Sequence, residues 1–214
     1  MKRTVLALAV VTLTAGGEII DRIVGAAGTD VVTLSEARRY LEYQSVFQNK
    51  ELDLSRQAYR EAVDQLLNQV LIRREIEISR YTPPAMSEAE KRLNEWMADK
   101  DRGLKMQKQL AAYGITEDDL RKRLLWYITV IRFTDYRFSP GVQVRDEEIE
   151  EYYKSNFLPQ FRKTSPGAPE PSLDESRAAI QQILVQQKTT QATNEWLNLA
   201  RQQARVRIFE EALP

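Results

Sequence analysis

The side chains best suited to chemistry in this sequence are acids that stand in runs at the starts of predicted helices. The run DEEIEE covers residues 146–151, and EDD covers residues 117–119. Neighbouring residues on a helix point in different directions, so these carboxylates are not expected to converge on a metal ion or to form a catalytic pair. Acids in a first helical turn instead interact favourably with the helix dipole. We therefore predict neither catalytic residues nor a metal site in these runs.

Histidine and cysteine are both absent from the 214 residues. Histidine is the commonest general base near neutral pH and the commonest metal ligand, and cysteine supplies disulfides and thiol nucleophiles. The eight glycines are scattered, so there is no phosphate-binding loop, and no serine lies in a nucleophile elbow. The sequence therefore predicts a protein that is not an enzyme and uses no cofactor.

The charge balance argues against nucleic acid as a partner. Lys and Arg together number 31, and Asp and Glu also number 31, so no net field attracts phosphates. We interpret the basic runs at 73–74 and 121–123 as solvated helix faces rather than phosphate sites. With 43% hydrophobic and 29% charged residues, the chain is typical of a globular, helix-rich protein.

Aromatic and methionine side chains gather in the middle of the chain, where helices are predicted. Flexible methionines and amphipathic aromatics suit the loose recognition of apolar segments. We predict that some of this group contact a client polypeptide, with core packing as the alternative for each of them. The residues are Trp96, Met97, Met106, Tyr113, Trp126, Tyr127, Phe133 and Tyr136.

A β-hairpin is predicted ahead of these helices. Ile20, Ile23 and Val24 are β-branched and predict one strand. Residues 28–30 have turn chemistry, and Val31 and Val32 start the predicted return strand. Ser35 is the predicted N-cap of the helix that follows, with Glu36 in its first turn.

Apolar residues at helical spacing predict several helices after this hairpin. Ser87 and Glu90 form a predicted capping box, and Gly114 is a predicted left-handed C-cap. Thr116 is expected to start a long central helix, and Asp146 is expected to cap a later one. The expected helices cover residues 35–48, 54–79, 87–103, 104–113, 116–138, 146–157 and 173–204.

The last third of the chain is predicted to contain a linker and a final strand. Residues 158–172 hold four prolines and are interpreted as the linker. Polar and apolar residues alternate over 205–209, which predicts a half-buried strand. A two-stranded hairpin is only marginally stable alone, so this strand is expected to pair with it, either in the same chain or swapped from a partner.

The first 17 residues are typical of a secretory signal. Lys2 and Arg3 precede a short apolar core at 5–13, and residues 15–17 are small, as cleavage requires. A buried N-terminal strand or helix is the alternative. The apolar run is too short for a bilayer, which needs about 20 residues. We therefore expect a mature chain that starts near Glu18 and does not span a membrane.

Four segments, in this order, resemble the SurA-like periplasmic chaperones. DRIVGAAGTDVVTLSE at 21–36 is similar to the hairpin and helix entry that open the mature chain of that family. LKMQKQLAAYGITEDDLRKRLLWYITVIRF at 104–133 resembles its short helix ending in glycine, followed by a long helix. VQVRDEEIEEYYKSNF at 142–157 and AAIQQILVQQKTTQATNEWLNLARQQARVRI at 178–208 resemble the segments that flank its isomerase domains.

The resemblance implies a mainly α fold with a distinct domain organisation. Residues 1–17 would be the signal peptide, and 18–157 a helical module like the SurA N-terminal domain, with a small β-hairpin at its N-terminus. Residues 173–214 would supply a long helix and a strand that pack back on this module and complete the hairpin. In the family, a parvulin-type prolyl isomerase domain stands where 158–172 stands here. Parvulin active sites contain two histidines, so no catalytic residue is carried over.

The resemblance also implies a function. We expect an ATP-independent periplasmic holdase that binds unfolded envelope or outer-membrane proteins and has no prolyl isomerase activity. A helical scaffold that binds one folded partner is the alternative, and a homodimer formed by segment swapping is compatible with either. An open apolar groove favours the holdase, whereas a flat, self-complementary patch favours assembly.

Overall fold

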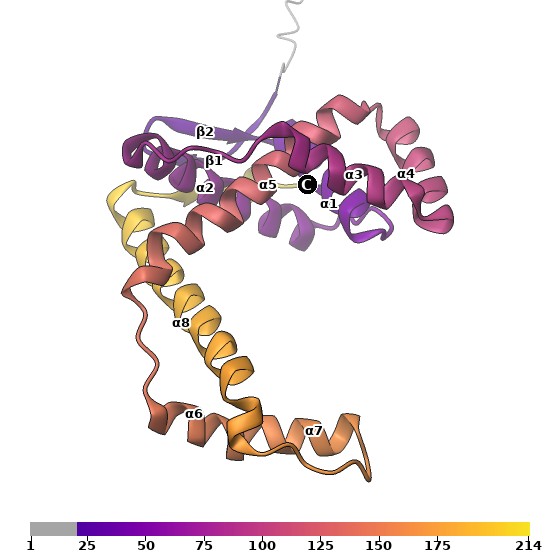
Figure 1. Cartoon of the computed structure of the whole chain (residues 1–214). Coiled ribbons are helices and arrows are strands. Elements are labelled where there is room, and N and C mark those ends of the chain that lie inside the picture. Colours follow the sequence, from indigo (N-terminus) through magenta and orange to yellow (C-terminus); the bar gives the residue numbers. More distant parts are fainter. Residues whose placement is uncertain (1–20) are drawn as a thin grey trace, which may run out of the picture.

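The computed structural model describes residues 21–214, so the predicted signal sequence lies outside the described residues. This part of the chain is mainly α-helical with one small antiparallel sheet, which confirms the predicted fold class (Figure 1). The elements are β1 (Ile23–Ala27), β2 (Asp30–Thr33), α1 (Leu34–Gln48), α2 (Arg56–Ser79), α3 (Met86–Ala98), α4 (Lys100–Tyr113), α5 (Glu117–Phe138), η1 (Ser139–Gly141), α6 (Asp146–Tyr152), η2 (Tyr153–Phe157), α7 (Leu158–Thr164), α8 (Leu173–Gln203), β3 (Arg207–Ile208) and η3 (Glu210–Ala212).

The predicted pairing of the last strand with the hairpin is confirmed, and it occurs within the chain. The strand order is β2-β1-β3, and Gly25 of β1 stands opposite Ile208 of β3. The Phe209 N–H extends the pairing by donating to the Val24 carbonyl at 2.9 Å. A side chain at Gly25 would meet Val63 of α2, because a Cβ built there lies 2.8 Å from a Val63 methyl carbon. Glycine therefore lets α2 approach the sheet closely.

The main core lies between the sheet, α2, the C-terminal end of α8 and the C-terminal tail. Trp196, Leu197 and Ala200 of α8 pack against it, and Arg201 anchors α8 to α2 by an ion pair with Asp64 at 2.7 Å. The buried members of this core are Val24, Ala27, Val32, Ala37, Tyr59, Ala62, Val63, Leu67, Leu71 and Leu213.

A second core joins α1 to the helices that follow α2. It includes buried residues of α3, α4 and α5, namely Leu93, Met106 and Leu120, together with Val46 of α1. A third, smaller core places Phe133 of α5 against Ile72 and Ile76 of α2. Since α5 belongs to both clusters, it is central to the body, as its apolar faces predicted.

Three helix starts differ from the sequence-based predictions. α1 is capped by Thr33 rather than Ser35, because Thr33 and Glu36 complete a reciprocal capping box. α3 begins at Met86 and has no side-chain cap, so Ser87 already lies inside its first turn. α6 starts at Asp146, which makes Arg145 the N-cap residue.

Ser35 has a different partner from the one that capping would give it. Its hydroxyl donates to the carboxylate of Asp21, and its N–H donates to the same side chain at 3.2 Å. Hydrogen bonds from Ser35 and Thr33 lower the pKa of Asp21 to about 2. This contact ties the start of β1 to the start of α1.

The break between α3 and α4 falls at Asp99, not at Gly103 as predicted. The Asp99 carboxylate accepts a hydrogen bond from the Arg102 N–H at 2.8 Å and so caps α4. Gly103 lies inside α4, where a Cβ would stand 2.5 Å from the Met97 carbonyl oxygen. This glycine is therefore needed for close packing of consecutive helices and not for helix termination.

The far end of α8 carries α6, η2 and α7, well away from the sheet (Figure 1). The predicted linker is wrong over its first half, because Leu158–Thr164 is helical. Pro159 lies in the first turn of this helix, where the missing N–H costs little. Phe161 stacks on Phe157 with ring centroids 6.4 Å apart. Only residues 165–172 connect α7 to α8 without helix.

The C-terminal tail should contribute strongly to the stability of the fold. Leu213 is only 4% exposed in the main core, so we expect Leu213→Ala to lower the free energy of unfolding by about 2–5 kcal/mol. Leu199→Ala is the matched control, because Leu199 is 59% exposed and its loss should change stability by about 0.5 kcal/mol or less. Chemical denaturation followed by circular dichroism measures both. Equal effects of the two changes would contradict the packing of the tail.

Candidate functional site

The eight residues predicted to contact a client do not form one surface. Met106 is 1% exposed and Phe133 is fully buried. The prediction is therefore wrong for these two residues, which are core. Burial follows from their positions, since Met106 faces the second core and Phe133 faces α2.

Four more of the eight lie at the edges of the cores. Trp96, Met97 and Tyr113 pack against the second core, and Trp126 packs against the third. Their polar groups are also held in place: the Trp126 indole N–H donates to Gln69 at 2.9 Å, for example. These side chains present only part of their surface to solvent.

The remaining two, Tyr127 and Tyr136, are exposed by 54% and 59%. They stand nine positions apart on α5, which is about two and a half helical turns, so they lie on opposite sides of the helix. Tyr136 stacks near Tyr81, with ring centroids 5.2 Å apart. Neither Tyr127 nor Tyr136 is among the residues that line the groove described next.

An opening with a few apolar residues among polar ones runs along α5, and we call it the α5 groove. It consists of two adjoining hollows, one of about 460 Å³ between α3 and α5 and one of about 630 Å³ between α5 and α8. Both are lined by Ile131 and Arg132, which join them. The other lining residues are Glu88, Lys91, Arg92, Glu95 and Ile128 in the first, and Thr134, Asp135, Gln182, Val185, Gln186, Thr189, Thr190, Thr193 and Asn194 in the second.

Ile131 is 52% exposed, although it continues the helical spacing of the buried residues Leu120 and Leu124. The reason is that α3 packs along one side of α5 and isoleucines of α2 pack against Phe133 on another, whereas the contacts of α8 leave the side chain of Ile131 half open. The sequence holds a signal for this result, because α5 is apolar on more faces than its neighbours can bury.

The two hollows of the α5 groove have different chemistry. In the first, charged side chains border the apolar floor, and Arg132 pairs with Glu88 across it, with one contact at 2.8 Å. In the second, the α8 side contributes amides and hydroxyls with no charge, such as Gln186 and Thr190. The α8 side thus offers hydrogen bonds from uncharged groups beside the apolar Ile131 and Val185, while the charged Arg132 and Asp135 come from α5.

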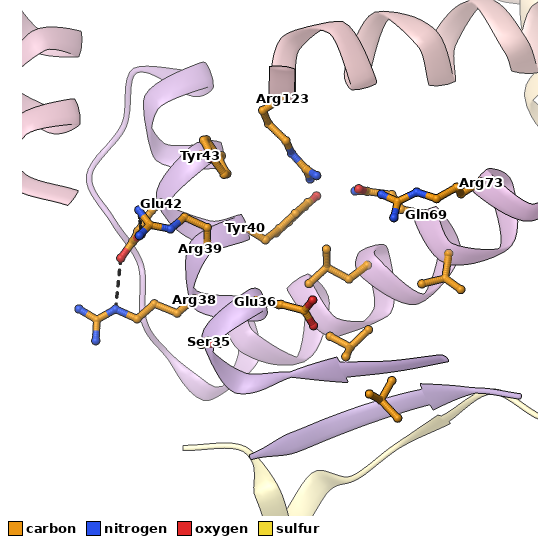
Figure 2. Close-up of a pocket in the computed structure, with 14 residues that line it drawn as sticks. Ser35, Glu36, Arg38, Arg39, Tyr40, Glu42, Tyr43, Gln69, Arg73 and Arg123 are labelled. Atoms are coloured by element: carbon orange, nitrogen blue, oxygen red, sulfur yellow. Dashed lines mark hydrogen bonds and ion pairs between the residues drawn. The ribbon is translucent and has the colours of Figure 1, made fainter. Parts of the chain in front are cut away.

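A second candidate site lies at the other side of the body, between β2, α1, α2 and α5 (Figure 2). Its volume is about 730 Å³, and we call it the arginine pocket. The residues that line it are Val31, Val32, Ser35, Glu36, Arg38, Arg39, Tyr40, Glu42, Tyr43, Leu66, Gln69, Val70, Arg73 and Arg123.

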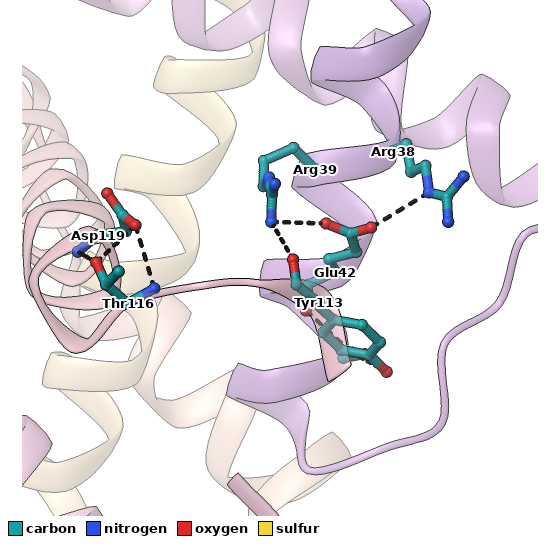
Figure 3. A network of polar contacts seen from close by, with 7 residues as sticks. Arg38, Arg39, Glu42, Tyr113, Thr116 and Asp119 are labelled. Atoms are coloured by element: carbon teal, nitrogen blue, oxygen red, sulfur yellow. Dashed lines mark hydrogen bonds and ion pairs between the residues drawn. The ribbon is translucent and has the colours of Figure 1, made fainter. Parts of the chain in front are cut away.

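The two acids of the arginine pocket are already engaged. Glu42 is buried and lies between Arg38 and Arg39, at 3.2 and 3.0 Å (Figure 3). Arg39 also donates to the Tyr113 carbonyl at 2.8 Å, which links α1 to the end of α4. Glu36 accepts from the Thr33 N–H at 2.9 Å as part of the α1 cap.

The start of α5 lies beside this network and is held by a cap of its own (Figure 3). Thr116 accepts from the Asp119 N–H at 3.1 Å, and Asp119 accepts from the Thr116 N–H at 3.2 Å. Hydrogen bonds from Thr116 lower the pKa of Asp119. The predicted start of this helix at Thr116 is confirmed. Arg123 lies two turns after this cap and lines the pocket.

Arg73 and Arg123 are the other two arginines of the pocket. Within residues 21–214, neither guanidinium forms an ion pair or a hydrogen bond with a protein group. Arg123 instead lies over the rings of Tyr40 and Tyr43, at 5.2 and 5.8 Å from their centroids. Burial lowers the pKa of Arg123, and the positive charge of Arg73 lowers it further.

The interpretation of both basic runs as solvated faces is thus partly wrong. Arg123 is half-buried in the pocket. Arg74 turns to the hairpin, where it pairs with Asp30 and donates to the Ala27 carbonyl at 2.9 Å. No local sequence pattern indicates that residues 73 and 123 meet, because the contact depends on how α5 crosses α2.

Comparison of the sequence with protein-family models and with curated proteins finds no match. Among the helices of residues 21–214, none combines the length and apolar character needed to cross a membrane. In the same residues, no group of three or more acidic side chains is arranged to hold a metal ion. The two openings are therefore the features on which a functional proposal can rest.

The contrast between Phe133 and Ile131 can be tested directly. Phe133→Ala should lower the free energy of unfolding by about 3–5 kcal/mol, because it empties a buried site. Ile131→Ala, two positions earlier on the same helix, should change it by about 0.5 kcal/mol or less. Urea titrations of both variants decide the matter, and a large loss for Ile131→Ala would show that the groove is closed in solution.

Proposed function

We propose that this protein is an ATP-independent periplasmic holdase of the SurA-like class, which binds unfolded envelope or outer-membrane proteins. The observation that carries the proposal is the α5 groove. Ile131 lies exposed at its centre, between two hollows that differ in chemistry. One hollow lies between α5 and α8 and the other between α3 and α5. Figure 1 shows α5 and α8 at an angle to each other. A long groove with exposed apolar side chains suits an extended client better than a folded partner.

The groove chemistry fits a client without a fixed sequence. An unfolded chain exposes apolar side chains and an unpaired main chain at the same time. Ile131, Ile128 and Val185 offer contacts to the apolar side chains. Amides and hydroxyls of α8, such as Gln186 and Thr190, can donate to main-chain carbonyls and accept from N–H groups whatever the client sequence.

The order of sequence segments supports the SurA-like assignment. In that family, the segment between the helix at 146–157 and the long helix at 173–203 holds the isomerase domain. Here, a short helix and eight residues of connection fill that place. The chain also has no histidine and no cysteine. We therefore propose that the protein holds clients without isomerising their prolines.

A passive holdase needs contacts that a client can leave unaided. Burial of apolar surface contributes about 25 cal/mol per Å², and the ordering of a flexible client offsets part of this gain. Dissociation constants around micromolar, about −8 kcal/mol, are the expected result. This range permits release without nucleotide hydrolysis.

Light scattering of an aggregating outer-membrane protein tests the proposal. The full chain should suppress aggregation at a near-equal molar ratio, and Ile131→Asp should weaken client binding by about tenfold or more, because full burial of one such side chain contributes about 1.5–3 kcal/mol. Leu199→Asp is the matched control, since Leu199 is equally exposed on a helix but does not line the groove. Its effect should be small.

Two outcomes would contradict the holdase. If aggregation proceeds unchanged with the wild-type chain, holding is absent. If pull-downs then return one folded partner, the helical scaffold is the better description. If Ile131→Asp and Leu199→Asp weaken client binding equally, the protein is still a holdase, but the α5 groove is not its binding site.

The periplasmic location has a separate test. The basic start and short apolar core of residues 1–17 motivate it. N-terminal sequencing of the protein from its native cells should find a mature chain that starts near Glu18. A chain that still begins at Met1 would overturn export through a cleaved signal.

A further inference from the structure

We propose that the arginine pocket binds the C-terminal carboxylate of a polypeptide whose last side chain is apolar. The pocket shares no lining residue with the α5 groove. This inference therefore does not depend on the holdase proposal, and it concerns a second, more selective site on the same protein.

The charges of the pocket favour an anion. Four arginines and two glutamates line it, and the two glutamates are engaged by Arg38, Arg39 and the α1 cap. Arg73 and Arg123 are left with no acidic partner in the described residues. Each guanidinium carries five N–H donors. Arg123 lies over the rings of Tyr40 and Tyr43, and Arg73 lies over the ring of Trp126, but an aromatic ring is not a strong hydrogen-bond acceptor. A carboxylate between these two arginines would relieve their mutual repulsion and use their donors.

The other walls of the pocket favour an apolar group beside the anion. Val32, Leu66 and Val70 form an apolar floor from β2 and α2. Tyr40 adds an aromatic face, and burial raises the pKa of its hydroxyl, which therefore stays protonated as a hydrogen-bond donor. The Gln69 side chain, which accepts from Trp126 through its oxygen, keeps its amide N–H groups free to donate into the same space. Figure 2 shows Tyr40, Gln69 and Arg123 directed towards one another.

The position of β2 favours a polypeptide as the bearer of the carboxylate. β2 is an edge strand of the sheet and lines the pocket with Val31 and Val32. An edge strand presents main-chain N–H and C=O groups that no neighbouring strand pairs. Extended peptides commonly bind by adding a strand to such an edge while a pocket beside it receives a side chain. Val31 is 47% exposed there, so the edge is accessible.

The size of the pocket separates this ligand from other anions. A volume of about 730 Å³ lies in the usual range for small ligands, about 300–1,000 Å³, and exceeds what one phosphate would fill. Inorganic phosphate would use the arginines but leave the apolar floor uncovered. A membrane surface would require the cations to protrude, whereas Arg123 lies half-buried between α1, α2 and α5.

The test is fluorescence anisotropy with two versions of one labelled hexapeptide that ends in valine and phenylalanine. One version has a free carboxylate and the other a C-terminal amide. The full chain should bind the acid about tenfold or more tightly than the amide, because a hydrogen bond to a charged group is worth about 1.5–3 kcal/mol. Arg123→Gln and Arg73→Gln should each weaken binding of the acid by about tenfold.

Lys122→Gln is the matched control, since it removes the same charge from the neighbouring position of α5. Lys122 pairs with Asp118 and does not line the pocket. The affinity of this variant for the peptide acid should therefore stay within about twofold of the wild-type value. Ile131→Asp should leave the preference for the acid over the amide unchanged, which separates failure of this site from failure of the α5 groove. If Arg123→Gln does not fold, the more exposed Arg73→Gln decides.

Three results would overturn the proposal. The first is equal affinity for acid and amide, and the second is no binding at about millimolar protein. The third is a preference for inorganic phosphate, or for vesicles of anionic phospholipid, that depends on the same two arginines. That result would assign the pocket to a phosphate group instead of a peptide terminus.

Discussion

The pairing of β3 with β1 is the contact on which the rest of the structure depends. A hairpin of two strands is marginal alone, and the third strand comes from the other end of the chain. The same region fixes the end of α8, since the Ala204 carbonyl accepts from the Gly28 N–H of the hairpin turn at 2.7 Å. Gly28 has φ 61°, a conformation that glycine adopts without strain. The direction of α8 is thereby set by the sheet.

The length of α8 turns this anchoring into an open architecture. Its 31 residues span about 46 Å, and only the C-terminal part packs on the main core through Trp196, Leu197 and Ala200. The middle of the helix faces α5 across the groove, and its first turns pack against α6 and η2 around Ile180. A helix anchored at one end therefore leaves a side of α5 uncovered, and that uncovered side holds Ile131.

The α5 groove and the arginine pocket are lined by different kinds of side chain, although the chain as a whole has no net charge. The α5 groove combines apolar side chains with uncharged hydrogen-bonding groups on α8 and with charges of both signs on α3 and α5, which suits ligands of many sequences. The arginine pocket concentrates unpaired positive charge next to an apolar floor, which suits one kind of chain end. Two like charges are tolerated there because Arg123 rests on tyrosine rings and Arg73 on Trp126, at 4.9 Å from its ring centroid. Such cation–π contacts contribute about 0.5–2 kcal/mol.

The sequence by itself determined the fold class, the order of the elements and most helix boundaries. These features depend on local periodicity, caps and turn residues such as Thr116 and Gly114, whose effects reach only a few positions. Where several polar residues compete, as Thr33 and Ser35 do, the local signal placed the cap two residues away from its true position. Only the tertiary structure decided which apolar faces are buried. Phe133 and Ile131 are both apolar residues of the same helix, yet α2 helps to bury Phe133 completely, while Ile131 stays half exposed. The meeting of Arg73 with Arg123 was decided in the same way, because periodicity specifies the faces of a helix but not the neighbour that each face meets.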